Sequence, residues 1–192
     1  MKVLVACEFS GVVRDAFAAK GHDAWSCDLL PTEKPGQHRQ IDVSHILNDG
    51  WDLMIAHPPC TFLVVAANRH MLNNPRRWVQ RLDALLFIKT LLDCNIPRIA
   101  LENPVGVISS HIRKPDQTIQ PWQFGHSESK ATCLWLKNLP LLKPTDVLEK
   151  PSERWDNQTV SGQNKLGPSD GRARIRSITY QGIANAMAEQ WG

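Results

Sequence analysis

A cysteine and a glutamate about forty residues apart each follow a short apolar run. Cys60 comes after Pro58 and Pro59, which end the run 51–56, and Glu102 follows the run 99–101. Two consecutive prolines restrict the backbone and would hold the thiol in one direction. A thiol beside a carboxyl group can attack an electron-poor ring while one ring nitrogen is protonated. The alternatives are an ordinary buried cysteine and a capping or surface carboxylate.

The elements that must position these residues alternate between strands and helices. Apolar runs at 3–6, 24–29, 51–56 and 99–101 predict strands, and a weaker extended segment precedes Asp42. A helix is expected after the turn at Gly11, and apolar positions at helical spacing predict another over 78–95. Residues 133–136 predict a further strand and 183–191 a closing helix.

This alternation predicts an α/β fold with a doubly wound, mostly parallel sheet, in which ligands bind beyond the carboxyl ends of the strands. We expect one domain over residues 1–192. The segment 140–171 is rich in Pro, Ser, Asn, Asp and Gly, so it is predicted to be a long loop.

Composition excludes several classes of protein. The 192 residues, 42% of them hydrophobic and 21% charged, suit one globular domain. The longest apolar runs are far shorter than a membrane span, so we expect no transmembrane segment, no signal peptide and a cytoplasmic location. The five cysteines lack metal-ligand spacing, which predicts reduced thiols and no metal. A net charge of +3 is compatible with a polyanionic partner but does not require one.

Taken in order, the motifs resemble those of the DNA cytosine-C5 methyltransferases, and more closely short phage and prophage proteins similar to them. Pro-Pro-Cys at 58–60 and Leu-Glu-Asn-Pro at 101–104 are the most specific matches. The resemblance implies a Rossmann-like S-adenosylmethionine-dependent methyltransferase fold. It also implies methyl transfer to C5 of cytosine, with Cys60 as covalent nucleophile and Glu102 stabilising the protonated N3.

The resemblance also implies a site for S-adenosylmethionine. Phe-Ser-Gly at 9–11 is similar to the family's first cofactor motif, Asp28 would hold the ribose hydroxyls, and Asp42 would lie near the adenine. The segment 176–187 is similar to the last motif, which returns to the cofactor. The implied cofactor-binding residues are Phe9, Ser10, Gly11, Asp28, Asp42, Pro58 and Asn185.

Lys130 is the third catalytic candidate that the resemblance implies. It stands where larger relatives carry Gln-x-Arg-x-Arg and would help to bind the flipped base, although a solvated lysine ahead of a strand is an equal alternative. The sequence also departs from the family: His57 replaces a glycine, Pro104 a valine, and Cys7-Glu8 the usual Asp-Leu. The segment 140–171 is the only candidate for a target-recognition region.

The expected partner is DNA, single- or double-stranded, with protection of phage DNA from restriction as one role. Arg69, Arg76, Arg77 and Arg81 could contact phosphates, or could form a solvated helix face. Two other functions stay open. The same chemistry could act on a free cytosine nucleotide or with another donor group, or the chain could be a catalytically silent nucleic-acid-binding relative.

Overall fold

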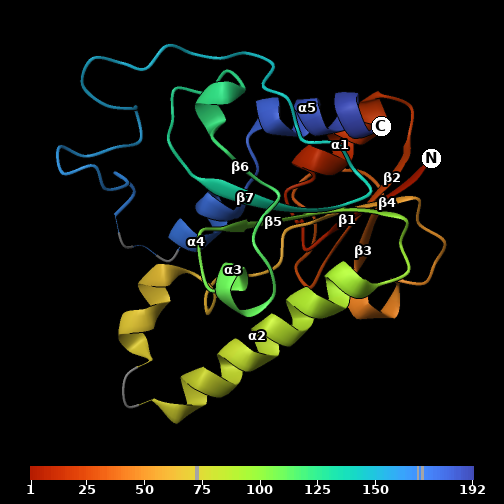
Figure 1. Ribbon diagram of the computed structural model, residues 1–192. Coiled ribbons are helices and arrows are strands. Elements are labelled where there is room, and N and C mark those ends of the chain that lie inside the picture. The colour runs from red at the N-terminus through yellow and green to blue at the C-terminus, as the bar shows by residue number, and fades with distance from the viewer. Residues whose placement is uncertain (72–73, 168, 170) are drawn as a thin grey trace.

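The computed structural model describes residues 1–71, 74–167, 169 and 171–192. Seven strands form one sheet in the order β3-β2-β1-β4-β5-β7-β6 (Figure 1). Strands β1 to β5 are parallel, whereas β7 runs antiparallel to both of its neighbours. The strand bounds are β1 Lys2–Ala6, β2 Asp23–Asp28, β3 His38–Gln40, β4 Leu53–Ala56, β5 Arg98–Pro104, β6 Gln117–Ile119 and β7 Thr132–Lys137.

Helices cover both faces of this sheet (Figure 1). Helices α1 and α5 pack together on one face, and the long helix α2 lies on the other. The helices are α1 Val12–Ala19, α2 Pro75–Asp93, α3 Ile108–His111, α4 Arg172–Ser177 and α5 Gln181–Trp191. Shorter 3₁₀ turns are η1 Val43–His45, η2 Val65–His70 and η3 Pro121–Gln123.

The central strands are apolar on both faces because each face is buried by a helical layer. In β1, Val3 and Val5 point into the cluster under α1 and α5, while Leu4 and Ala6 point into the cluster under α2. All four side chains are fully buried. The predicted α/β fold with a doubly wound, mostly parallel sheet is therefore confirmed.

Strand β5 is longer than the sequence-based expectation. Strand β5 does not stop at Leu101 but continues to Pro104, because β7 pairs with it up to the partners Pro104 and Thr132. Proline fits at this last position, beyond which the strand needs no further ladder hydrogen bond. The reversed direction of β7 then places the start of that strand, rather than its end, beside the carboxyl ends of β4 and β5.

The segment 140–171 has no helix and no strand among its described residues; Pro168 and Asp170 lie outside the described residues. Its first part is nevertheless tied to the body of the protein. The backbone N–H of Leu148 donates to the carbonyl of Trp122 at 2.9 Å, and that of Asp156 donates to Ser127 at 2.9 Å. Across the described part of the chain, no helix combines the length and the apolar character needed to cross a membrane.

Candidate functional site

Cys60 and Glu102 come together at the carboxyl ends of the neighbouring strands β4 and β5. Ala56 pairs with Leu101, so the next residues, His57 and Glu102, lie side by side. His57 Nδ1 is 3.3 Å from Glu102 Oε2. The side chain of Asn103, which is buried, donates from Nδ2 to the carbonyl of Pro58 at 2.9 Å. Strand β5 thus holds the proline turn that carries Cys60.

The chain beyond Cys60 is clamped to the chain beyond β5. Leu63 and Val64 both donate backbone hydrogen bonds to the carbonyl of Cys60, forming a turn there. The N–H of Val107 donates to the carbonyl of Leu63 at 2.8 Å, and Gly106 forms a bridge with Val64. A side chain at Gly106 would place its Cβ 2.1 Å from the Leu63 carbonyl oxygen, so only glycine permits this approach.

The Cys60 thiol is partly buried and its protonated form is favoured. Burial raises the pKa of Cys60, and the negative charge of Glu102 raises it further. The positive charges of Lys130 and Arg176 act in the opposite direction without reversing the shift. Because the thiolate is the nucleophilic form, Cys60 would have to lose its proton before it could react.

Glu102 is held in its ionised form by its neighbours. Burial raises the pKa of Glu102, but His57, Lys130 and the hydroxyl of Thr132 together outweigh burial and leave the pKa of Glu102 below its ordinary value. The Glu102 side chain is 19% exposed, so a ligand can still reach it. The neighbouring residues therefore orient the Glu102 carboxylate, and a ligand can reach its exposed side.

Lys130, expected from the sequence to be the third catalytic residue, lies close enough to influence both groups electrostatically. Its Nζ donates to the carbonyl of Arg176 at 2.7 Å and lies 5.6 Å from the ring centre of Tyr180. These contacts order the lysine, so it is not a freely solvated side chain ahead of β7. The structure brings Cys60, Glu102 and Lys130 into one site.

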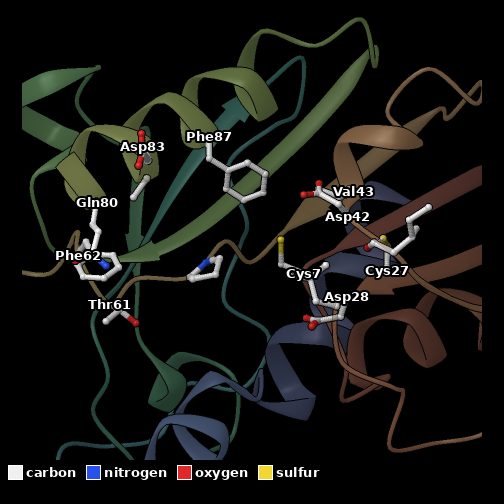
Figure 2. A pocket seen from close by; sticks show the side chains of 14 residues that line it. Cys7, Cys27, Asp28, Asp42, Val43, Thr61, Phe62, Gln80, Asp83 and Phe87 are labelled. Atoms are coloured by element: carbon white, nitrogen blue, oxygen red, sulfur yellow. Dashed lines mark hydrogen bonds between the residues drawn. The ribbon is translucent and has the colours of Figure 1, made fainter. Parts of the chain in front are cut away.

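A cavity of about 460 Å³ lies next to this site (Figure 2). This volume is within the range of small-molecule sites. Figure 2 shows residues from the strand ends on one side and from α2 on the other. The lining residues are Cys7, Cys27, Asp28, Leu29, Ile41, Asp42, Val43, Pro59, Thr61, Phe62, Gln80, Asp83, Ala84 and Phe87.

Two carboxylates face a largely apolar cavity. Asp28 Oδ1 accepts from the N–H of Leu30 at 2.9 Å, and Asp42 Oδ1 accepts from the N–H of Ser44 at 2.9 Å. The carboxylates of Asp28 and Asp42 both line the cavity. Burial raises the pKa of Cys27 to about 11 and also raises the pKa of Cys7, so both thiols stay uncharged at neutral pH. Two acceptors flanked by apolar side chains fit an adenosine-containing cofactor, whose hydroxyl and amino groups are donors.

Phe9, Ser10 and Gly11 form the turn before α1 but do not line the cavity. Glu8 fills this turn instead: its carboxylate accepts from the N–H of Val13 at 2.7 Å and from that of Arg14 at 3.2 Å. The first turn of α1 is thus capped by the chain itself. A ligand reaching this turn would meet Gly11, whose φ of 73° favours glycine.

The remaining predicted cofactor residues are placed differently. Pro58 is buried behind the cavity, and its neighbour Pro59 forms part of the wall. Asn185 lies on α5, where it accepts from Gln181 Nε2 at 2.9 Å and lines a separate groove between α1 and α5. The structure therefore does not bring Asn185 to the cavity beside Asp28 and Asp42.

Two groups of site residues were missed by sequence reasoning. The α2 wall of the cavity consists of Gln80, Asp83, Ala84 and Phe87, whose i, i+3, i+4, i+7 spacing marks one helix face. That spacing could have indicated the wall. The contacts of His57 and Thr132 with Glu102 join distant parts of the chain and leave no local pattern.

The arginines considered for phosphate contact are not equivalent. Arg81 is buried, and its guanidinium donates to the carbonyl of Phe62 and to Asn68 Oδ1. It is therefore neither a phosphate ligand nor part of a solvated face. Arg77 stacks over the Phe62 ring at 5.2 Å, whereas Arg69 and Arg76 are exposed.

No protein-family model and no curated protein matches this sequence. Among solved structures, the chain is similar to a prophage-encoded protein of E. coli that is described as a candidate DNA modification methyltransferase. The TM-score is 0.49 and the sequence identity 15%, over 77% of this chain and 51% of the other. The chain thus spans about half the length of that protein.

Proposed function

We propose that this protein transfers a methyl group from S-adenosylmethionine to C5 of cytosine in DNA through a covalent adduct on Cys60. The observation that carries the proposal is the pairing of Cys60 and Glu102 at adjacent strand ends, beside a cavity lined by the carboxylates of Asp28 and Asp42. A buried, oriented carboxylate next to a constrained thiol is costly to maintain in a protein that only binds.

The residues divide the reaction between them. The Cys60 thiol gives its proton to the Glu102 carboxylate, which passes it to N3, and the resulting thiolate forms a bond to C6 of the cytosine, so that C5 becomes nucleophilic. Lys130 balances the negative charge of the pair, as its effect on both pKa values indicates. After transfer, a water molecule takes the C5 proton, the electron pair left at C5 expels the Cys60 thiolate from C6, and the proton on N3 returns through Glu102 to the thiolate.

Asp28 and Asp42 are the residues proposed to hold S-adenosylmethionine, through ribose hydroxyls and the adenine amino group respectively. When bound, this cofactor supplies an electrophilic methyl group. Phe62, Phe87 and Pro59 supply the apolar walls that exclude water from the adenosine.

DNA is the proposed substrate, and single strands are favoured over duplexes. A cytosine in a duplex must be flipped out of the stack, which costs a few kcal/mol that single strands largely avoid. The segment 140–171 is the candidate for a region that reads a duplex sequence. Protection of phage DNA from restriction is one role such methylation would serve.

The test is transfer of labelled methyl from S-adenosylmethionine to single-stranded DNA, double-stranded DNA and dCMP in parallel. We expect label in DNA, and we expect Cys60→Ala to remove it. Cys94→Ala is the matched control, since Cys94 caps the far end of α2 and should leave the activity unchanged. DNA containing 5-fluorocytosine should trap the wild-type protein in a covalent complex, because fluorine cannot leave as a proton does.

Other outcomes redirect the proposal. Label confined to dCMP would make the protein a nucleotide-modifying enzyme. Label that persists in Cys60→Ala would remove the covalent mechanism. No label and no trapping, with DNA still bound, would point to a silent binding relative.

A further inference from the structure

His57 is a histidine with a buried side chain, and its backbone and the residue after it are both held by hydrogen bonds. Its side chain is only 7% exposed, and its backbone N–H donates to the carbonyl of Ala6 at 2.9 Å. The ring therefore has little freedom to turn away from Glu102, whose Oε2 lies 3.3 Å from Nδ1. On the far side, Asn103 holds the carbonyl of the next residue, Pro58.

The second ring nitrogen identifies the tautomer. His57 Nε2 is buried and has no hydrogen-bond partner among the described residues. A proton on Nε2 would be a buried donor without an acceptor, which costs more than an unshared lone pair in the same place. Nδ1 faces a carboxylate oxygen and so carries the proton. The geometry thus matches a ring that donates from Nδ1 to Glu102.

The two carboxylate oxygens of Glu102 are consequently distinguished. His57 approaches Oε2, and Oε1 is the oxygen that would meet the base, with the Thr132 hydroxyl as a second neighbour of the carboxylate. A carboxyl group that exchanges a proton with N3 must present one oxygen in the plane of the ring, and a fixed partner on the other oxygen sets that plane.

We propose that His57 is a positioning residue for Glu102: its Nδ1–H holds one carboxylate oxygen and thereby aims the other at N3 of the cytosine. This role rests on the proposed function, since it concerns the base that Glu102 would meet. It also sets how readily Glu102 takes a proton. The other titratable or charged groups around Glu102 are Cys60, Lys130 and Cys133, and substitution at His57 leaves all three in place.

A pair of substitutions of nearly equal size separates the hydrogen bond from simple filling of space. His57→Asn keeps an N–H donor near the position of Nδ1, whereas His57→Leu does not. We expect His57→Leu to lower kcat at least about tenfold with little change in KM for DNA, and His57→Asn to keep most of the activity. Equal activity of the two variants would overturn the positioning role.

Titration of the Glu102 carboxyl, followed by NMR with carbon-labelled glutamate, gives a readout that needs no methyl transfer. Glu102→Gln identifies the resonance. His57→Leu should raise the pKa of Glu102, and His57→Asn should keep it low. If the wild-type protein transfers no methyl group but the titration behaves this way, the proposed function fails while the His57–Glu102 contact stands. An unchanged pKa in His57→Leu would overturn the contact itself.

The ring nitrogens of wild-type His57 provide a check that no folding defect can obscure. Nitrogen-15 shifts should show a proton on Nδ1. A ring protonated on Nε2 alone would overturn the proposal.

Discussion

At rest, the protonation states of Cys60 and Glu102 are the reverse of those that the proposed reaction needs. Glu102 raises the pKa of Cys60, so the thiol keeps its proton, while His57, Lys130 and Thr132 keep Glu102 ionised. The reactive arrangement needs the reverse, a thiolate beside a carboxyl that can give a proton. We infer that arrival of the cytosine draws the thiol proton through Glu102 to N3 and so releases the Cys60 thiolate.

Glu102→Gln should therefore change two reactions of the site in opposite directions. Removing the negative charge lowers the pKa of Cys60, so alkylation of Cys60 by iodoacetamide at pH 7.5 should become severalfold faster. Methyl transfer should fall at least about a hundredfold, because the proton donor is lost. Mass spectrometry of the Cys60 peptide measures the first rate and labelled methyl the second.

The raised pKa of Cys60 also sets how the rate of its alkylation depends on pH. In the wild-type protein the alkylation rate should rise about tenfold for each pH unit, up to a pH above the usual titration range of a cysteine thiol. Lys130→Met should slow alkylation, because the lysine charge lowers the pKa of Cys60. Slower alkylation in Glu102→Gln would contradict the electrostatic account.

At the scale of elements, the site depends on the close contact between the turn after β4 and the chain after β5. Gly106→Ala would push a methyl group against the Leu63 carbonyl, where the backbone cannot move without breaking the Val107–Leu63 hydrogen bond. We expect the free energy of unfolding to fall by about 2 kcal/mol and methyl transfer to fall with it. Urea denaturation followed by circular dichroism measures the first effect.

Gly171→Ala is the matched control for that experiment. Gly171 has a φ of −82°, and within the described part of the chain nothing lies within 4 Å of an added Cβ. The free energy of unfolding of Gly171→Ala should stay close to that of the wild-type protein. If both variants lost the same free energy of unfolding, the close contact between Gly106 and the Leu63 carbonyl would contribute nothing specific.

The strand ends could be predicted from sequence because apolar runs stop there at polar or proline residues, as 51–56 does before His57 and Pro58. The placement of Cys60 and Glu102 at one edge followed from that. The contact between His57 and Glu102 could not be predicted, because it joins residues 45 positions apart and depends on the register of β4 and β5.

The turn before α1 could be predicted only in part, for a different reason. The turn before α1 was expected at Gly11 and is there, but the sequence did not show that Glu8 caps the helix. That contact depends on Cys7, whose φ of 59° turns the chain so that Glu8 points back toward the N–H of Val13. A left-handed residue other than glycine has no clear mark in a single sequence.

For the whole molecule, the charge available to DNA is small. The net charge is +3, and much of the basic side-chain content is already engaged within the protein. Arg14 and Arg81 are buried. Ion pairs on the surface join Arg39 with Asp49, Lys89 with Asp93, Arg113 with Asp116, and Arg174 with Glu33.

Binding to single-stranded DNA should consequently depend only modestly on salt. Neutralising about three or four phosphates gives a slope of roughly −2 to −3 in a plot of log K against log salt concentration. Fluorescence anisotropy with a labelled oligonucleotide between 50 and 200 mM KCl measures it. A slope near −7 would mean that an extended basic surface, or several copies of the chain, meets the DNA.

The reversed direction of β7 has a consequence for the chain that follows it. Strand β7 starts at the edge of the sheet that carries Cys60 and Glu102 and ends, at Lys137, at the opposite edge. The chain must therefore return to the first edge before Arg176 can meet Lys130. The six residues of β7 cover about 20 Å, and a similar number of extended residues would suffice for the return. The segment 140–171 is several times longer than that crossing requires. The part of the segment beyond the hydrogen bonds of Leu148 and Asp156 could change in length without disturbing the sheet, and a DNA-reading element could be gained or lost there while Cys60 and Glu102 stay in place.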